Sequence, residues 1–317
     1  MKKRIFPGLL ALLLLLCACS PQQPWQEAYD RTGQALAAQE NYGVGSVGGE
    51  WAIIGLSRSG LLKDSAAQSY LQRVEDYVRT IGTARLDRAK STENSRIILG
   101  VTAAGGDVTN FGGVNLLEGL TDMQFVAFQG INGPIWALIA FDCGGYEIPT
   151  AQPGEEQTSR EALVDLILRE RKDDGGWSFA GDVSDPDMTG MALTALAPYT
   201  QRTDVSEAEE SALQCLSDLQ LDDGGYESWG SKNSESCAQV IVALTALGIA
   251  PQKDPRFTKN GRNVVDALCD FALEDGFYHS DELVEVNGMA TEQAYYALTA
   301  YARFQDGKAR LYDMTEK

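Results

Sequence analysis

Apolar residues recur along most of this chain at spacings of three and four, which is typical of amphipathic helices. Segments 206–220 and 261–273 carry apolar residues on one face and polar residues on the other. Segment 237–249 is apolar nearly all round, so we expect it to form a buried helix. The pattern therefore predicts two kinds of helix, one at the surface and one in the interior.

The buried segments form a repeat. Each copy is anchored by one apolar residue, and successive anchors stand 39 to 55 residues apart. The anchors are Ile53, Leu99, Leu138, Leu193, Leu244 and Leu298. This spacing leaves room for two helices in each unit, as in helical repeat proteins.

An acidic, glycine-rich turn that ends in an aromatic residue joins the two helices in three units. Gly224 and Gly225 are expected to supply the positive φ angles that stop a helix. Asp222 and Asp223 are expected to accept backbone hydrogen bonds in the turn. The aromatic residues are predicted to fill the gap between neighbouring hairpins, at positions Trp177, Tyr226 and Phe277.

Six hairpins of an outer and an inner helix predict an all-α fold, an α/α toroid that spans residues 30–317. Closing the ring lets every inner helix bury both flanks. The alternative is an open solenoid of helical pairs. We favour closure because the units are long and few, and because they end without a polar capping repeat.

The N-terminus has the features of an export signal. A basic start, a short apolar stretch and the sequence "LCAC" at 16–19 follow one another, and the apolar stretch is too short to span a bilayer. Residues 1–18 are therefore predicted to be a lipoprotein signal peptide, Cys19 the lipidated residue and residues 19–29 a tether. This places the protein outside the cytoplasm, anchored to the bacterial membrane.

Charge and cysteine content narrow the function further. The chain has 26 Lys and Arg against 45 Asp and Glu, which argues against nucleic acid as a partner. The chain has a single histidine, His279, so a catalytic or metal site built from several histidines is excluded. A chain of this size does not require disulfides. Pairing of Cys215 with Cys269 stays open beside the simpler interpretation that the cysteines are buried free thiols.

One turn matches a known motif. "QLDDGGY" at 220–226 fits Q-x-x-x-G-x-aromatic, the core of the QW motif of terpenoid cyclases and of protein prenyltransferase β subunits. Gln39 to Gly43 keeps the Q-x-x-x-G part, whereas Arg171 and Ala272 replace the glutamine in the other two turns. The toroid therefore resembles the prenyltransferase/squalene-cyclase repeat proteins. That superfamily also includes the cobalamin carriers and the complement-type thioester domains.

The resemblance to cyclases implies an acid that protonates an alkene. Within "SDPDMTGMALTAL" (184–196), Asp185 and Asp187 match two acids of a D-x-D-D motif, but Met188 replaces the last one. This stretch is equally similar to one in the cobalamin carriers. The simpler interpretation is that Asp187 caps the inner helix. If the protein is an enzyme, Asp187 and Asp185 are the candidate catalytic residues.

The other reactive groups of the superfamily are incomplete here. Glu235 and Cys237 have the spacing of two zinc ligands, but Gln293 stands where the third ligand, a histidine, is expected. Two ligands make a poor zinc site, so we predict no metal. Ala290 replaces the cysteine of the thioester motif. A glycosidase with two carboxylates also remains conceivable, although no pair of acids stands out.

The inner helices begin with polar and aromatic residues, and in a toroid these starts converge on one rim. Such a rim resembles a ligand pocket. The predicted ligand-binding residues are Trp51, Glu93, Asn94, Trp136, Asp187, Gln239, Glu292, Gln293 and Tyr295. We therefore expect a small-molecule binding protein that requires no cofactor. Resemblance to the cobalamin carriers makes a corrinoid the leading ligand, and an enzyme acting on an isoprenoid is the alternative.

The predicted anchor is open to a direct test. We expect Cys19→Ala to move the protein from the membrane fraction to the soluble fraction, because the variant lacks the thiol that carries the lipid. Fractionation of cells followed by immunoblotting measures this shift. A variant that stays in the membrane at the wild-type level would rule out lipidation as the anchor.

Overall fold

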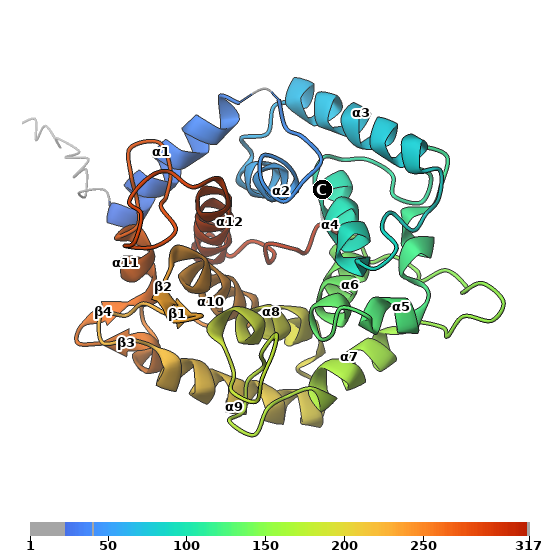
Figure 1. The fold of residues 1–317 in the computed structure, drawn as a ribbon. Coiled ribbons are helices and arrows are strands. Elements are labelled where there is room, and N and C mark those ends of the chain that lie inside the picture. Colours follow the sequence, from blue (N-terminus) through green and yellow to red (C-terminus); the bar gives the residue numbers. More distant parts are fainter. Residues whose placement is uncertain (1–22, 40, 316–317) are drawn as a thin grey trace, which may run out of the picture.

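The computed structural model describes residues 23–39 and 41–315 and confirms the predicted all-α toroid (Figure 1). Within these residues, six inner helices form a ring: α2 (Glu50–Ser59), α4 (Ser91–Ala103), α6 (Asn132–Cys143), α8 (Pro186–Leu196), α10 (Ser234–Ala246) and α12 (Gly288–Gln305). The outer helices are α1 (Pro24–Ala37), α3 (Asp64–Ile81), α5 (Met123–Ala127), α7 (Arg160–Arg169), α9 (Thr203–Leu219) and α11 (Val264–Cys269).

The remaining elements are short. The 3₁₀ helices are η1 (Leu116–Leu120), η2 (Ala197–Tyr199) and η3 (Pro255–Phe257). Two antiparallel hairpins pair β1 (Glu227–Ser228) with β2 (Ser231–Lys232) and β3 (Thr258–Lys259) with β4 (Arg262–Asn263). No helix in the described ranges is long and apolar enough to cross a membrane.

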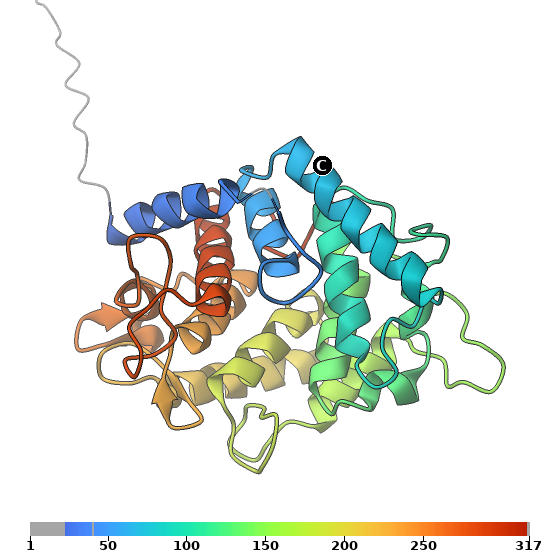
Figure 2. The same ribbon diagram turned by 45° about the horizontal axis from the view of Figure 1, so that its top comes forward.

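The ring is closed. Each inner helix contacts the next one, and α12 packs on α2 to complete the circle (Figures 1 and 2). All six predicted anchors, from Ile53 to Leu298, are fully buried. The inner helices therefore form the core of the fold. This is expected, because a helix that is apolar on every side must be buried.

The N-terminal boundary differs from the sequence prediction. The toroid begins at Pro24 rather than at residue 30, because α1 is held by contacts with the last inner helix. Ala28 is buried, and the ring of Trp25 lies 4.9 Å from that of Tyr301. Cys19 and the predicted signal peptide lie outside the described residues.

The aromatic residue of the first acidic turn links an outer helix to an inner one. The backbone N–H of Trp177 donates to Oγ1 of Thr189 at 3.0 Å, and its carbonyl accepts from the N–H of Asp185 at 2.9 Å. Its indole N–H donates to the carbonyl of Ile167 in α7 at 2.7 Å. The buried turn is thus fastened to both helices of its hairpin.

The same backbone contacts recur in the other two acidic turns. The carbonyl of Tyr226 accepts from the N–H of Asn233, and the carbonyl of Phe277 accepts from that of Asn287. The N–H of Phe277 donates to Thr291 at 2.9 Å. The acidic turns are therefore structural, as predicted, and the hydrogen bonds of Trp177 and Tyr226 join the two helices of a single hairpin.

The two glycines of the turn have different roles, which corrects the prediction that both supply positive φ. Gly224 has φ 85°, whereas Gly225 is outside the positive-φ region. The position of Gly225 corresponds to Gly176 in the first turn, where a Cβ atom would lie 2.6 Å from Oγ1 of Thr189. In the first turn the second glycine therefore gives the inner helix room to approach, whereas a Cβ atom on Gly225 would lie 3.0 Å from Cε of Lys232 in β2.

The contact with Thr189 predicts a measurable loss of stability. We expect Thr189→Val to lower the free energy of unfolding by about 1–3 kcal/mol, because it leaves the buried N–H of Trp177 without an acceptor. Thr189→Ser keeps the hydroxyl and is the matched control. Denaturant unfolding of both variants compares them, and equal midpoints would contradict the proposed role of this hydrogen bond.

Candidate functional site

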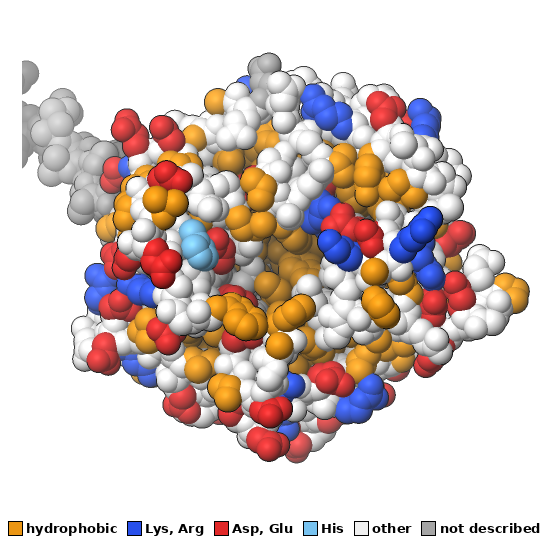
Figure 3. All heavy atoms as spheres, viewed as in Figure 1, with side chains coloured by type: hydrophobic (Ala, Val, Ile, Leu, Met, Phe, Trp, Pro, Cys, Tyr) orange, Lys and Arg blue, Asp and Glu red, His pale blue; other side chains and the backbone are white. Residues whose placement is uncertain are grey.

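The inner helices all begin on one face of the ring, as predicted. Asp185, Asn233 and Asn287 cap three of these starts, and each side chain accepts a hydrogen bond from a backbone N–H of its own helix. Figure 3 shows a hollow at the centre of this face, with hydrophobic side chains at its floor. We call this hollow the mouth.

Aromatic side chains from three inner helices and the C-terminal segment meet inside the ring below the mouth. The ring of Trp51 lies 5.0 Å from that of Trp136 and 6.0 Å from that of Tyr296. Tyr312 packs edge-on against Trp136 at 5.9 Å. Trp51 is half-buried and the other three are buried. The mouth therefore has an aromatic floor.

The C-terminal segment crosses the opposite end of the ring. The guanidinium of Arg58 donates to the carbonyls of Arg310 and Asp313, and the N–H of Met314 donates to the carbonyl of Cys143. Leu311 and Tyr312 are buried by this arrangement. This segment shapes the aromatic floor from behind, a role that no repeat in the sequence indicates.

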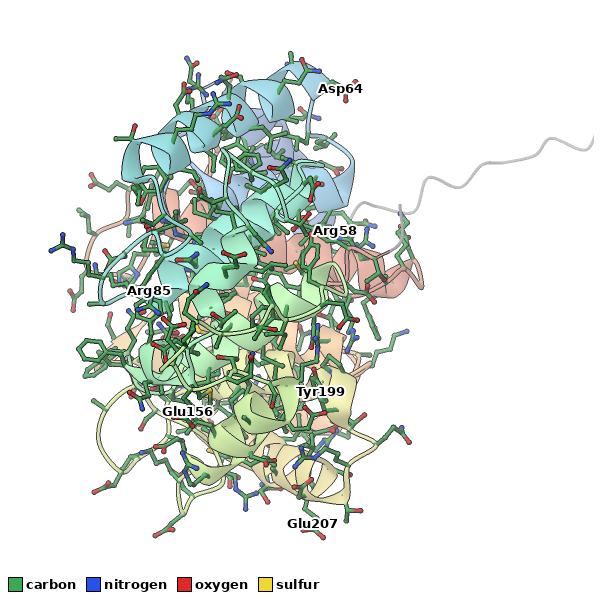
Figure 4. All side chains as sticks on the ribbon, turned by 90° about the vertical axis from the view of Figure 1, so that its right-hand side faces the viewer. Arg58, Asp64, Arg85, Glu156, Tyr199 and Glu207 are labelled. Carbon is green, nitrogen blue, oxygen red and sulfur yellow. The ribbon has the colours of Figure 1, made fainter. Side chains whose placement is uncertain are left out.

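A cavity of about 290 Å³ lies at this opposite end, lined by Thr194, Tyr199, Val242 and the C-terminal segment. Figure 4 shows Tyr199 and Arg58 toward one end of the ring and Arg85, which precedes an inner helix, toward the other end. The hydroxyl of Tyr199 donates to Asp142 at 2.8 Å. None of the predicted ligand-binding residues lines this cavity.

Two glutamines and a tyrosine form a polar group beside the aromatic floor. The amide nitrogen of Gln239 donates to Oε1 of Gln293 at 2.8 Å and to the hydroxyl of Tyr296 at 2.5 Å. Gln239 and Tyr296 are buried, whereas Gln293 is half-buried. The structure thus brings together two predicted residues, Gln239 and Gln293, around a tyrosine outside the predicted set.

Asp187 lies in the first turn of α8 and is not the helix cap. The cap is Asp185, whose carboxylate accepts from the N–H groups of Met188 and Phe179. The prediction of Asp187 as the cap is therefore wrong: the helix begins at Pro186, one residue after Asp185.

Burial raises the pKa of Asp187 to about 6, and the nearby hydroxyls of Ser236 and Ser228 offset this rise in part. Oδ1 of Asp187 and the Oγ atoms of both serines are buried without completing a hydrogen bond of ordinary geometry. Unsatisfied buried polar atoms are uncommon in folded proteins. Asp187, Ser228 and Ser236 therefore form a small buried polar group whose hydrogen bonds are incomplete.

Buried charges occupy another part of the same face. Glu50 is fully buried, forms an ion pair with Arg96 and accepts from the hydroxyl of Tyr70 at 3.1 Å. Arg96 also pairs with Glu93, one of the predicted ligand-binding residues. Removing one partner of such a buried pair leaves an uncompensated charge, so this group stabilises the starts of α2 and α4.

Three predicted ligand-binding residues lie in the wall of the ring. Asn94 accepts from the N–H of Leu86 and donates to two backbone carbonyls. Glu292 accepts from the N–H of Gly48 at 2.6 Å. Tyr295 stacks on Tyr29. Each faces a neighbouring element, because a helix buried on all sides presents only some of its residues to the lumen.

The two residues with zinc-ligand spacing, Glu235 and Cys237, have different surroundings. Oε2 of Glu235 lies 2.8 Å from Nδ1 of His279. Cys237 is fully buried, and burial raises the pKa of its thiol to about 12. The described residues contain no cluster of three potential metal ligands. Cys215 and Cys269, whose pairing the sequence left open, are both free thiols.

Comparison with known proteins supports the architecture. No protein-family model and no curated protein sequence matches this chain. Among solved structures, Candida albicans protein geranylgeranyltransferase-I, complexed with GGPP, is similar with a TM-score of 0.54 and 10% sequence identity. The match covers 87% of this chain and 86% of that chain. At this identity, the likeness shows the fold alone.

The buried acids predict a specific dependence of stability on pH. Burial raises the pKa of Asp187 to about 6 and that of Glu292 to about 7, both above the usual range of carboxyl groups. The carboxyl groups of Asp187 and Glu292 therefore bind a proton more tightly in the folded state than in the unfolded state. Their contribution to stability is complete below about pH 4 and is lost as pH rises through 6 and 7.

We expect Asp187→Asn and Glu292→Gln each to remove part of this loss between pH 4 and pH 8. For Glu292 the difference in the free energy of unfolding is about 3 kcal/mol. Urea unfolding across this range measures it, and Glu207→Gln on the exterior of α9 is the control. If both variants show the same dependence of unfolding free energy on pH as the wild type, then neither acid has a raised pKa in the folded state.

Proposed function

We propose that the mouth of the toroid binds a small, largely apolar molecule that carries a few polar groups. The observation that supports this proposal is the aromatic floor of Trp51, Trp136 and Tyr296 beside buried polar atoms whose hydrogen bonds are incomplete. Ligand pockets commonly combine apolar walls with a few polar groups that fix orientation. Aromatic rings supply the area, and Asp187 with its neighbouring serines supplies the polar contacts.

The charges around the mouth favour an uncharged or cationic ligand. Arg96 is already paired with Glu50 and Glu93, and Asp187 adds a further acid. An isoprenoid diphosphate would therefore meet more negative than positive charge. A corrinoid remains the first ligand to test, since the family resemblance suggests it, and an uncharged isoprenoid alcohol is the second.

The acidity of Asp187 argues for binding over alkene protonation. Protonating an alkene requires a strong acid, whereas burial raises the pKa of this carboxyl and makes it a weaker one. The neighbouring Asp185 is held by backbone N–H groups as a helix cap. We therefore infer a carrier or receptor, exported and anchored through Cys19, in preference to a terpenoid cyclase.

Thermal unfolding with added ligands tests the proposal. We expect cyanocobalamin, cobinamide or farnesol to raise the melting temperature by mass action, with about 2.7 kcal/mol of added stability at a hundredfold excess over Kd. Trp51→Ala should weaken the effect at least tenfold, because it removes part of the aromatic floor. Trp229→Ala, which changes an exposed indole in a loop, is the control.

Three results are decisive. A shift that Trp51→Ala leaves intact would place the ligand elsewhere. Failure of all three compounds to shift the wild-type protein would remove the proposed ligand classes. Cyclisation of a polyprenoid, abolished by Asp187→Asn without loss of stability, would establish the enzymatic alternative instead.

A further inference from the structure

Exposed apolar side chains are concentrated around the mouth. Among the described residues, nine large apolar side chains are exposed, and eight of them lie in loops that lead into inner helices. These eight are Val47, Phe128, Phe179, Val183, Trp229, Leu283, Val284 and Val286. Because contiguous exposed apolar surface marks interaction sites, this distribution indicates a binding surface around the mouth.

Six of the eight belong to three neighbouring loops, 178–184, 227–231 and 281–286, which we call the half-crown. The segments beside the last two loops are joined, since Asn233 pairs with Ser280 and the N–H of Ser234 donates to the carbonyl of His279 at 3.0 Å. Helix α8, which follows the first loop, contacts β1 at the start of the second. The half-crown is therefore continuous over the starts of α8, α10 and α12.

Trp229 stands out within the half-crown. It is 79% exposed and occupies the turn of the β1–β2 hairpin with φ 57°, a region that favours Gly, Asn and Asp. A large aromatic residue there gains nothing from packing and adds backbone strain. Residues with such strained backbone angles cluster at functional sites, such as ligand clamps and switch regions.

The half-crown is also acidic. Its three loops carry Asp182, Glu227, Asp281, Glu282 and Glu285, and they contain no Lys or Arg. Figure 3 shows acidic and hydrophobic side chains interspersed on this part of the face. An anionic membrane surface would be repelled by these charges. A partner that combines apolar side chains with positive charge would match both features of the surface.

We propose that the half-crown binds a cationic amphipathic segment of a partner protein. The apolar side chains of the segment pack on Trp229, Phe179 and Leu283, and its Lys and Arg residues pair with the interspersed acids. The segment lies on the loops beside the mouth, so its binding surface differs from the aromatic floor proposed for the small molecule.

A synthetic amphipathic helix of Leu and Lys is a suitable probe, and fluorescence anisotropy of the labelled peptide measures binding. We expect the full chain to bind it and to reject the matched peptide with Glu in place of Lys. The double variant Trp229→Ser/Leu283→Ser should weaken binding about tenfold or more. Leu61→Ser, which removes the exposed apolar residue outside the loops around the mouth, is the matched control.

A second set of variants tests how much the acidic side chains contribute to binding of the peptide. Asp281→Asn/Glu282→Gln/Glu285→Gln should weaken binding and flatten its dependence on salt. The matched triple variant Glu161→Gln/Glu207→Gln/Glu210→Gln removes three exposed acids from the outer helices and should leave binding unchanged.

Equal binding by both triple variants, or equal binding of the Lys and Glu peptides, would overturn the proposal. Binding to phosphatidylcholine vesicles that requires Trp229 and Leu283, without binding of the Leu and Lys peptide, would identify a lipid surface as the partner and also overturn it. The thermal shift by small molecules is independent of these outcomes, so failure of one proposal leaves the other standing.

Discussion

Closure of the ring depends on how the side chain of Tyr295 fits between the first two helices. A Cβ atom on Gly33 in α1 or on Gly55 in α2 would lie 2.8 Å from the ring of Tyr295. The ring stacks on Tyr29 at 5.4 Å, and its hydroxyl donates to Ser59 at 2.8 Å. The last inner helix therefore closes on the first hairpin through one large side chain that fits beside two glycines.

The closed ring explains why the inner helices tolerate so little polarity along their length. Each one packs between two other inner helices and against the outer layer, so polar residues are accommodated mainly where the helices begin. There, side chains such as Asp185 and Asn287 satisfy free backbone N–H groups. The same geometry that caps the helices also gathers polar side chains around one mouth, and the mouth is thus a consequence of closure.

Much of the fold was predictable because all six units repeat an apolar helix, and three of them also repeat an acidic turn. The alignment of one repeat with the next was harder to predict. The two "ALTAL" phrases are offset by three residues in the structure: Leu193 lies eight positions after the cap Asp185, whereas Leu244 lies eleven after the cap Asn233. A helix that is buried all round keeps its apolar character after a slip of about one turn. Only the caps fix the alignment.

The site was predictable in part for the same reason. Periodicity placed Trp51, Trp136, Gln239 and Gln293 near the mouth, but it did not separate them from Asn94 and Tyr295, which face neighbouring elements. In an amphipathic helix the polar face identifies the solvent side, whereas in these helices no face is polar. Tyr312 carried no sequence signal at all, because it reaches the floor from a segment outside the repeat.

The two ends of the ring differ, because the C-terminal segment crosses only one of them. At one end, Leu311 and Tyr312 fill the lumen, and the guanidinium of Arg58 binds the carbonyls of that segment. At the other, Asp187 and Ser236 place buried oxygens close together without a hydrogen bond of ordinary geometry, and the buried hydroxyl of Tyr312 at the first end also lacks one. Leaving such groups without full hydrogen bonds costs free energy, so the fold carries this cost at both ends of the ring.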